Sequence, residues 1–101
     1  MKLNVMERIL LLQALPAEGD LITLRIVRDL KNNLSFTEKE HKDFGITQIK
    51  DNTSWTNGGD ADIQIGEKAT DIIVESLTKL NKENKLTVDH ISICDKFKVE
   101  A

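Results

Sequence analysis

The sequence has few of the residues that cross-link, kink or anchor a chain. It contains one cysteine, one proline and no tyrosine, and its longest unbroken apolar run is Ile9–Leu12. A single cysteine has no partner for an internal disulfide, which excludes the disulfide-stapled secreted scaffolds. The short apolar run is far below the roughly 20 residues that cross a bilayer. Since the first residues also lack the pattern of a signal peptide, we expect a cytoplasmic protein with no membrane span.

The residues that are present are typical of one globular domain. Of the 101 residues, 40% are hydrophobic and 31% are charged, which is enough for one hydrophobic core. We therefore expect a single α+β domain over residues 1–101. Fourteen basic and seventeen acidic residues give a formal net charge of −3, opposite in sign to proteins that bind phosphate backbones non-specifically. Nucleic acid is thus a disfavoured partner, although a local basic stripe would still permit it.

The hydrophobic spacing predicts a first helix over about residues 5–15. Asn4 and Glu7 have the spacing of a capping box at its start, and Pro16 ends it. This helix is apolar over most of its circumference, which is typical of a helix at the centre of a core. If the apolar surface of this helix is larger than the core can cover, the remaining part would contact a partner, and Leu11 is the candidate residue for that contact.

A second helix is predicted over about residues 21–32, with two distinct faces. Its apolar stripe consists of Leu21, Leu24, Val27, Leu30 and Leu34. Its outward face carries a group of basic side chains, namely Arg25, Arg28 and Lys31. A solvated helix face is the ordinary interpretation of this group, and a basic stripe that contacts nucleic acid is the alternative.

A short third helix is predicted to end before Gly45. Two alternative capping boxes offer a start for this helix: Ser35 with Glu38, and Thr37 with Glu40. Phe36 and Phe44 lie near its two ends, and we expect both aromatic rings to anchor the helix in the core.

From Gly45 onward the pattern changes to that of strands. Residues 46–49 and 53–56 are predicted to pair as a hairpin around the turn-like Asp51–Asn52. After a glycine-containing loop, residues 61–65 alternate with period two and predict a third strand. We therefore predict a small antiparallel meander of three short strands, which is stable only with helices packed on one face.

Two helices complete the predicted fold. The fourth helix follows Gly66 and carries its apolar residues at helical spacing: Ala69, Ile72, Ile73, Leu77 and Leu80. Thr87 can cap a final helix whose apolar face holds Val88, Ile91, Cys94 and Phe97. The expected architecture is a helix-rich α+β domain of about five helices, with the meander between the third and the fourth.

Few side chains suggest chemistry. His90 and Cys94 lie four residues apart on the predicted last helix, as two metal ligands would. A structural zinc site needs four ligands, and Cys94 lies on an apolar stripe where burial suppresses thiolate formation. We therefore assign no metal site, no cofactor and no catalytic residue, and we expect a protein that is not an enzyme.

Two groups of residues are candidates for recognition instead. Trp55 is the only tryptophan, and a tryptophan on a short strand either covers the core or forms a binding hot spot. Three helices followed by a hairpin also match the element order of a winged helix. In that alternative, the nucleic-acid contacts come from the second helix through Arg25, Arg28 and Lys31. The third helix is less suited to phosphates, because residues 37–43 contain three acidic residues against two lysines.

Two stretches of the chain, Met6–Gly19 and Ile65–Ile73, resemble small uncharacterised proteins encoded by bacteriophages and prophages. The resemblance touches both halves of the chain but contains no motif that assigns a role to a residue. It implies an accessory protein that acts by binding. We therefore expect a non-enzymatic module that binds a protein partner or a second copy of itself, with a winged-helix-like nucleic-acid binder as the alternative.

Overall fold

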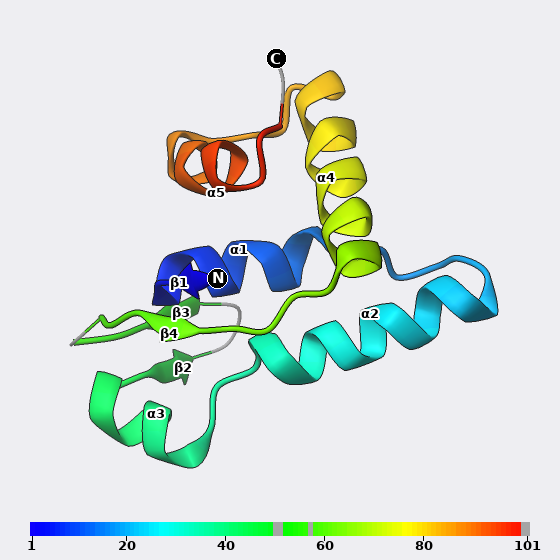
Figure 1. Cartoon of the computed structure of the whole chain (residues 1–101). Coiled ribbons are helices and arrows are strands. Elements are labelled where there is room, and N and C mark those ends of the chain that lie inside the picture. Colours follow the sequence, from blue (N-terminus) through cyan, green and yellow to red (C-terminus); the bar gives the residue numbers. More distant parts are fainter. Residues whose placement is uncertain (50–51, 57, 100–101) are drawn as a thin grey trace.

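The computed structural model describes residues 1–49, 52–56 and 58–99 (Figure 1). This part of the chain forms five α-helices: α1 (Val5–Ala14), α2 (Leu21–Leu34), α3 (Glu38–Phe44), α4 (Glu67–Lys82) and α5 (Ile91–Lys96). A 3-10 turn, η1 (Val88–His90), leads directly into α5. Four short strands accompany the helices: β1 (Lys2–Leu3), β2 (Thr47–Ile49), β3 (Asn52–Ser54) and β4 (Ala61–Asp62). The predicted helix-rich α+β class is confirmed. None of these helices is both long and apolar enough to span a membrane.

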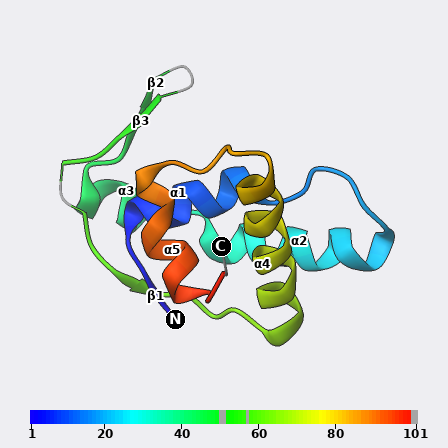
Figure 2. The same cartoon turned by 90° about the horizontal axis from the view of Figure 1, so that it is seen from above.

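Three helices form the centre of the molecule. α1, α2 and α4 contact one another pairwise (Figure 1 and Figure 2), and apolar side chains from all three meet in one buried cluster. β1, α5 and the segment after β4 add to it. The buried members are Leu3, Leu11, Leu15, Val27, Leu30, Leu34, Ile63, Ile73, Leu77, Ile93 and Phe97. The predicted core faces of the second and fourth helices are thus confirmed at Val27, Leu30, Leu34, Ile73 and Leu77.

The helix starts follow the predicted capping chemistry. At the start of α1, Asn4 Oδ1 accepts a hydrogen bond from the Glu7 amide at 2.8 Å, and Glu7 Oε1 accepts one from the Asn4 amide at 2.9 Å. Of the two capping boxes predicted for the start of α3, the structure contains the one formed by Thr37 and Glu40. These reciprocal bonds satisfy amides that have no partner inside the helix. α2 runs on to Leu34, beyond its predicted end.

The predicted hairpin is confirmed. β2 and β3 pair antiparallel, with Thr47 opposite Ser54, while the predicted turn residue Asp51 lies outside the described residues. α3 ends just before the hairpin at Gly45, which has a left-handed backbone with φ of 61°. A Cβ at Gly45 would collide with the Thr56 side chain. Glycine is required here both for its conformation and for the close approach of the returning strand.

The third strand does not join the hairpin, which corrects the predicted three-stranded meander. β4 pairs with β1 instead, placing Leu3 opposite Ala61, so that the described strands form two separate pairs. Strand geometry also ends at Asp62, earlier than predicted. The pairing with β1 brings Leu3 and Ile63 into the core, where both are buried. Burial of these two side chains explains why β4 pairs with β1.

α3 and the hairpin are peripheral to the central helices and lie on the opposite side from α4 and α5 (Figure 1). No residue of α3 is buried. Phe36 and Phe44 are half-buried and do not belong to the buried cluster, so the prediction that they anchor the core is wrong. The physical reason is that the long amphipathic helix α4, and not α3, packs against α1 and α2.

Candidate binding surfaces

Arg8, a charged residue in the first turns of α1, is buried with 1% of it exposed. Its guanidinium donates hydrogen bonds to both carboxylate oxygens of Glu40. It also donates to two carbonyls at the end of α2, those of Leu34 at 3.0 Å and Ser35 at 2.7 Å. The Phe36 ring centre lies 4.1 Å from its Cζ, within range of a cation–π contact. Arg8 therefore fastens α3 to the central helices, and these contacts make its role structural.

The neighbouring Glu7 is buried to the same extent. Its Oε1 accepts a hydrogen bond from the Lys96 ammonium at 2.8 Å, and Lys96 also donates to the carbonyl of Lys2 at 2.9 Å. Burial alone would raise the pKa of Glu7, but hydrogen bonds from Lys96 and from the Asn4 amide outweigh it and lower the pKa. Through this carboxylate, Lys96 joins α5 to α1 and β1.

The buried ion pairs predict a fold that loses stability in acid. The hydrogen bond from Arg8 lowers the pKa of Glu40 below its ordinary value of 4.5. A carboxyl group with a lowered folded-state pKa stabilises the fold above its unfolded pKa, and this contribution is lost as the pH falls through the folded value. Between about pH 6 and about pH 3, Glu40→Gln should therefore lose less free energy of unfolding than the wild type, as measured by urea denaturation.

The matched control for this measurement is Glu38→Gln, because Glu38 is an exposed carboxylate in the same turn of α3. Its pH dependence should follow that of the wild type. If the Glu40→Gln variant instead loses stability in parallel with the wild type, the pairing of Glu40 with Arg8 does not contribute to the acid response.

A groove of about 210 Å³ lies between the end of α4 and α5, and we call it the α4–α5 groove. Its apolar lining comes from Leu86, Ile91, Cys94 and Val99. Its polar lining comes from Asn81, Thr87, His90 and Asp95. An apolar concave surface with a few polar side chains is typical of a ligand or partner site. The two residues that the sequence singled out for possible chemistry, His90 and Cys94, both lie here.

Each of these two residues has a structural role. His90 Nδ1 accepts a hydrogen bond from the Thr87 amide at 3.0 Å and so caps η1. Burial raises the pKa of the Cys94 thiol, and the neighbouring Asp95 raises it further, which disfavours the thiolate that nucleophiles and metal ligands require. Within residues 1–49, 52–56 and 58–99, no three His, Cys, Asp or Glu side chains are grouped so as to hold a metal ion. The α4–α5 groove thus offers contact surface.

The face of the last helix that the sequence pattern assigns to the core is exposed over its first half. Val88 is 80% exposed and Ile91 is 57% exposed, whereas Ile93 and Phe97 are buried. The reason is helix geometry, since residues three apart turn about 60° around an α-helix at each step, so that Val88 lies opposite Phe97, whereas Ile93 lies four residues from Phe97 and shares its buried side. The prediction is therefore wrong at Val88 and Ile91. Both side chains are exposed three residues apart in the chain, and Ile91 lines the α4–α5 groove.

The two residues predicted to contact a partner, Leu11 and Trp55, differ in how far they are buried. Leu11 has no exposed surface, because α1 is enclosed by α2, α4 and η1, so it belongs to the core and not to a contact surface. Ile9 and Leu12 of α1 remain partly exposed and line a separate groove of about 300 Å³. Trp55 is half-buried, with its indole nitrogen close to Gly58. A contact role for Trp55 stays a prediction.

The basic residues of the second helix are exposed as predicted, at Arg25, Arg28 and Lys31. The packing of the helices nevertheless departs from that of a winged helix, in which the third helix packs with the first two and enters the major groove. Here the three mutually packed helices are α1, α2 and α4. Comparisons with family models, curated proteins and solved structures found no match.

Proposed function

We propose that this protein is a non-enzymatic accessory module that binds another protein through the α4–α5 groove. The observation that carries the proposal is the exposure of two aliphatic side chains, Ile91, which lines the groove, and Val88, which directly follows the lining residue Thr87 in the chain. Fully burying one such aliphatic side chain contributes roughly 1.5–3 kcal/mol relative to leaving it in water. A partner that covers both side chains gains this free energy, whereas the isolated chain does not.

The groove matches the general construction of a protein-binding hot spot. Such sites combine an apolar centre with a polar rim that hydrogen-bonds the partner. Leu86, Ile91 and Val99 supply the apolar surface, and Asn81 and Asp95 supply polar groups. The occupant that fits is an apolar side chain of the partner, held by backbone hydrogen bonds to the polar lining.

Two features of the sequence support the accessory role. The stretches Met6–Gly19 and Ile65–Ile73 resemble small phage- and prophage-encoded proteins, for which binding without catalysis is the expectation. The single cysteine, Cys94, suits a reducing cytoplasmic setting, because no internal disulfide is formed. We include both the phage-type role and the cytoplasmic setting in the proposal.

The test compares affinity capture by three tagged chains in the cells that naturally produce the protein. Ile91→Glu should recover at least about tenfold less of the partner than the wild type, since it places a charge against an apolar contact. Gln64→Glu adds the same charge at an exposed site away from the groove and should recover as much as the wild type. Circular dichroism establishes that all three chains fold.

Equal recovery by Ile91→Glu and the wild type would show that the groove is not the binding surface. Nuclease treatment before capture separates the proposed function from its alternative. A partner that remains after nuclease supports protein binding, while a partner lost with the nucleic acid supports the nucleic-acid-binding alternative.

A further inference from the structure

A second unpartnered surface lies on α2. The first turns of this helix extend beyond the other helices (Figure 1 and Figure 2), and Leu21 and Ile22 are 64% and 68% exposed. Leu21 belongs to the stripe that the sequence pattern assigns to the core, so this position corrects the prediction. Arg25 lies four residues after Leu21, and Arg28 lies three residues after Arg25. These spacings place all three side chains on one side of the helix. We call Leu21, Ile22, Arg25 and Arg28 the α2 outer face.

A groove continues this face toward α1. It has a volume of about 270 Å³ and lies between α2 and the connection that precedes it. Pro16, Leu24 and Val27 supply apolar lining, and Arg28 and Lys31 supply positive charge. The lining of this groove therefore combines apolar and cationic side chains, whereas the lining of the α4–α5 groove contains no lysine or arginine.

The two arginines of the face are available to a partner. Of the three arginines in the chain, Arg8 is buried and paired, and the other two are Arg25 and Arg28. Arg28 Nε lies 3.5 Å from a carboxylate oxygen of Asp29, and both side chains are about two-thirds exposed. A pair this exposed contributes little. The planar guanidinium donates two parallel hydrogen bonds to a carboxylate, which makes arginine well suited to acidic partners.

We infer that the α2 outer face docks an acidic amphipathic segment of a partner protein. An apolar side chain of this segment covers Leu21 and Ile22, and carboxylates about one to two helical turns further along pair with Arg25 and Arg28. The charges are complementary on a local scale even though the whole chain carries −3. This surface is separate from the α4–α5 groove, so the inference does not depend on the proposed function.

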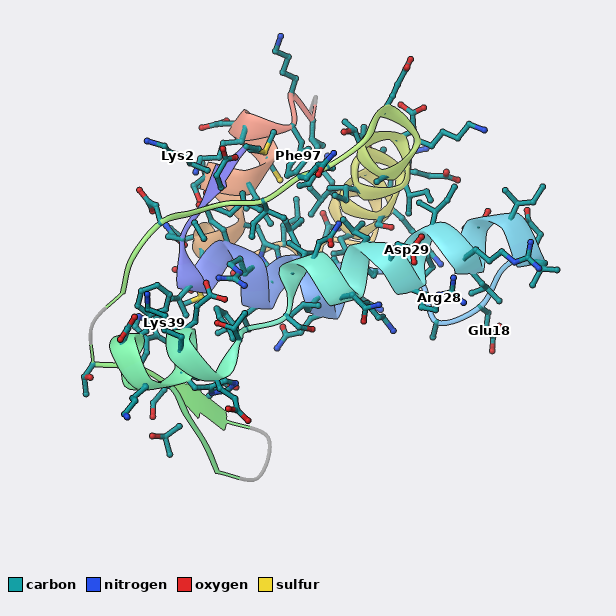
Figure 3. All side chains as sticks on the ribbon, turned by 60° about the horizontal axis from the view of Figure 1, so that its bottom comes forward. Lys2, Glu18, Arg28, Asp29, Lys39 and Phe97 are labelled. Atoms are coloured by element: carbon teal, nitrogen blue, oxygen red, sulfur yellow. The ribbon has the colours of Figure 1, made fainter. Side chains whose placement is uncertain are left out.

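An acidic protein segment fits this face better than nucleic acid does. A phosphate backbone needs a run of cations and gives exposed aliphatic side chains no apolar contact. The α2 outer face offers two arginines beside two aliphatic side chains, and Asp29 on α2 and Glu18 before it interrupt the positive charge (Figure 3). The α2 outer face can therefore make few phosphate contacts. An acidic amphipathic peptide, in contrast, can contact both the aliphatic and the arginine side chains of this face.

The test titrates isotope-labelled full chain with three probes and follows backbone amide shifts by NMR. The first probe is a helical peptide of about 15 residues with leucines on one face and glutamates beside them. The second probe replaces the glutamates by lysines, and the third is a DNA duplex. The leucine–glutamate peptide should shift amides of α2 and of the connection before it, and the other two probes should not.

Variants of the face give the quantitative outcome. The double variant Arg25→Ala and Arg28→Ala should weaken binding of the leucine–glutamate peptide at least about tenfold, and Leu21→Ala several-fold. The control Lys82→Ala removes an exposed cation from α4 and should bind unchanged. Ile91→Glu should also bind unchanged, so failure of this inference and failure of the α4–α5 groove are distinguishable.

Three results would overturn the inference. These are shifts confined to other elements, an unchanged affinity in the double arginine variant, and binding of the DNA duplex in preference to the leucine–glutamate peptide. The last result would instead assign the arginines of α2 to phosphate contacts, for which a steep loss of affinity with salt is diagnostic.

Discussion

An Arg8→Ala variant is expected to lose about 3–5 kcal/mol of its free energy of unfolding. The substitution leaves the Glu40 carboxylate and the carbonyls of Leu34 and Ser35 without their donor. It also removes the group that lies against the Phe36 ring. Domains of this size have total stabilities of about 5–15 kcal/mol, so the loss should be visible as a large shift of the urea midpoint measured by circular dichroism.

Arg25→Ala is the matched control, because it removes the same side chain from an exposed position on α2. We expect it to change the free energy of unfolding by no more than about 0.5 kcal/mol. A loss below about 1 kcal/mol for Arg8→Ala would mean that the cluster around this guanidinium does not hold α3 to the central helices.

A Leu77→Ala variant is expected to lose about 2–5 kcal/mol, because it opens a cavity where the three central helices meet. Leu77 is fully buried on α4. Leu21→Ala is the control with identical chemistry, and since Leu21 is mostly exposed on α2 it should cost far less. Urea denaturation of both variants measures the difference. Similar losses in the two variants would be incompatible with a core built from α1, α2 and α4.

The sequence was sufficient to predict the elements whose local signals agree. α1, α2 and α4 each combine helical spacing of apolar residues with a clear start or end, such as the Asn4–Glu7 capping box and Pro16. The hairpin follows from a change of period and a turn signal. In these segments the local preference and the tertiary packing favour the same conformation, which is why the prediction and the structure agree.

Contacts between distant segments could not be predicted in the same way. β1 has only two residues, too few for a periodic pattern, and its pairing with β4 joins Leu3 to Ala61. The stripe predicted for α2 includes Leu21, but at 3.6 residues per turn Leu21 lies about half a turn around the helix from the buried Leu30. It shares its side of the helix with the exposed Arg25 and Arg28 and is therefore left in solvent.

The exposed residues of the last helix follow from its geometry and not from its apolar composition. Val88, Ile91, Cys94 and Phe97 recur every three residues, and this spacing turns about 60° around an α-helix at each step, so that Val88 lies opposite Phe97. The core takes Ile93 and Phe97, which are four residues apart and share one side of the helix.

The buried charges were equally hard to foresee. The sequence assigns Glu7 only to the capping box and gives Arg8 no role, and a charged side chain is rarely fully buried unless it is paired. Their partners, Lys96 and Glu40, are remote in the chain. The one available signal was that two charges interrupt a helix that is otherwise apolar nearly all round.

Site-specific photo-crosslinking tests binding through the α4–α5 groove most directly. A photoreactive amino acid at Val88, which is exposed and directly follows the groove residue Thr87 in the chain, should crosslink the full chain to a protein partner in the cells that produce it. The same amino acid at Gln64 should not, and adding Ile91→Glu to the Val88-labelled chain should remove the crosslink. A Val88 crosslink that persists with Ile91→Glu, or that is no stronger than the one from Gln64, would contradict binding through this groove.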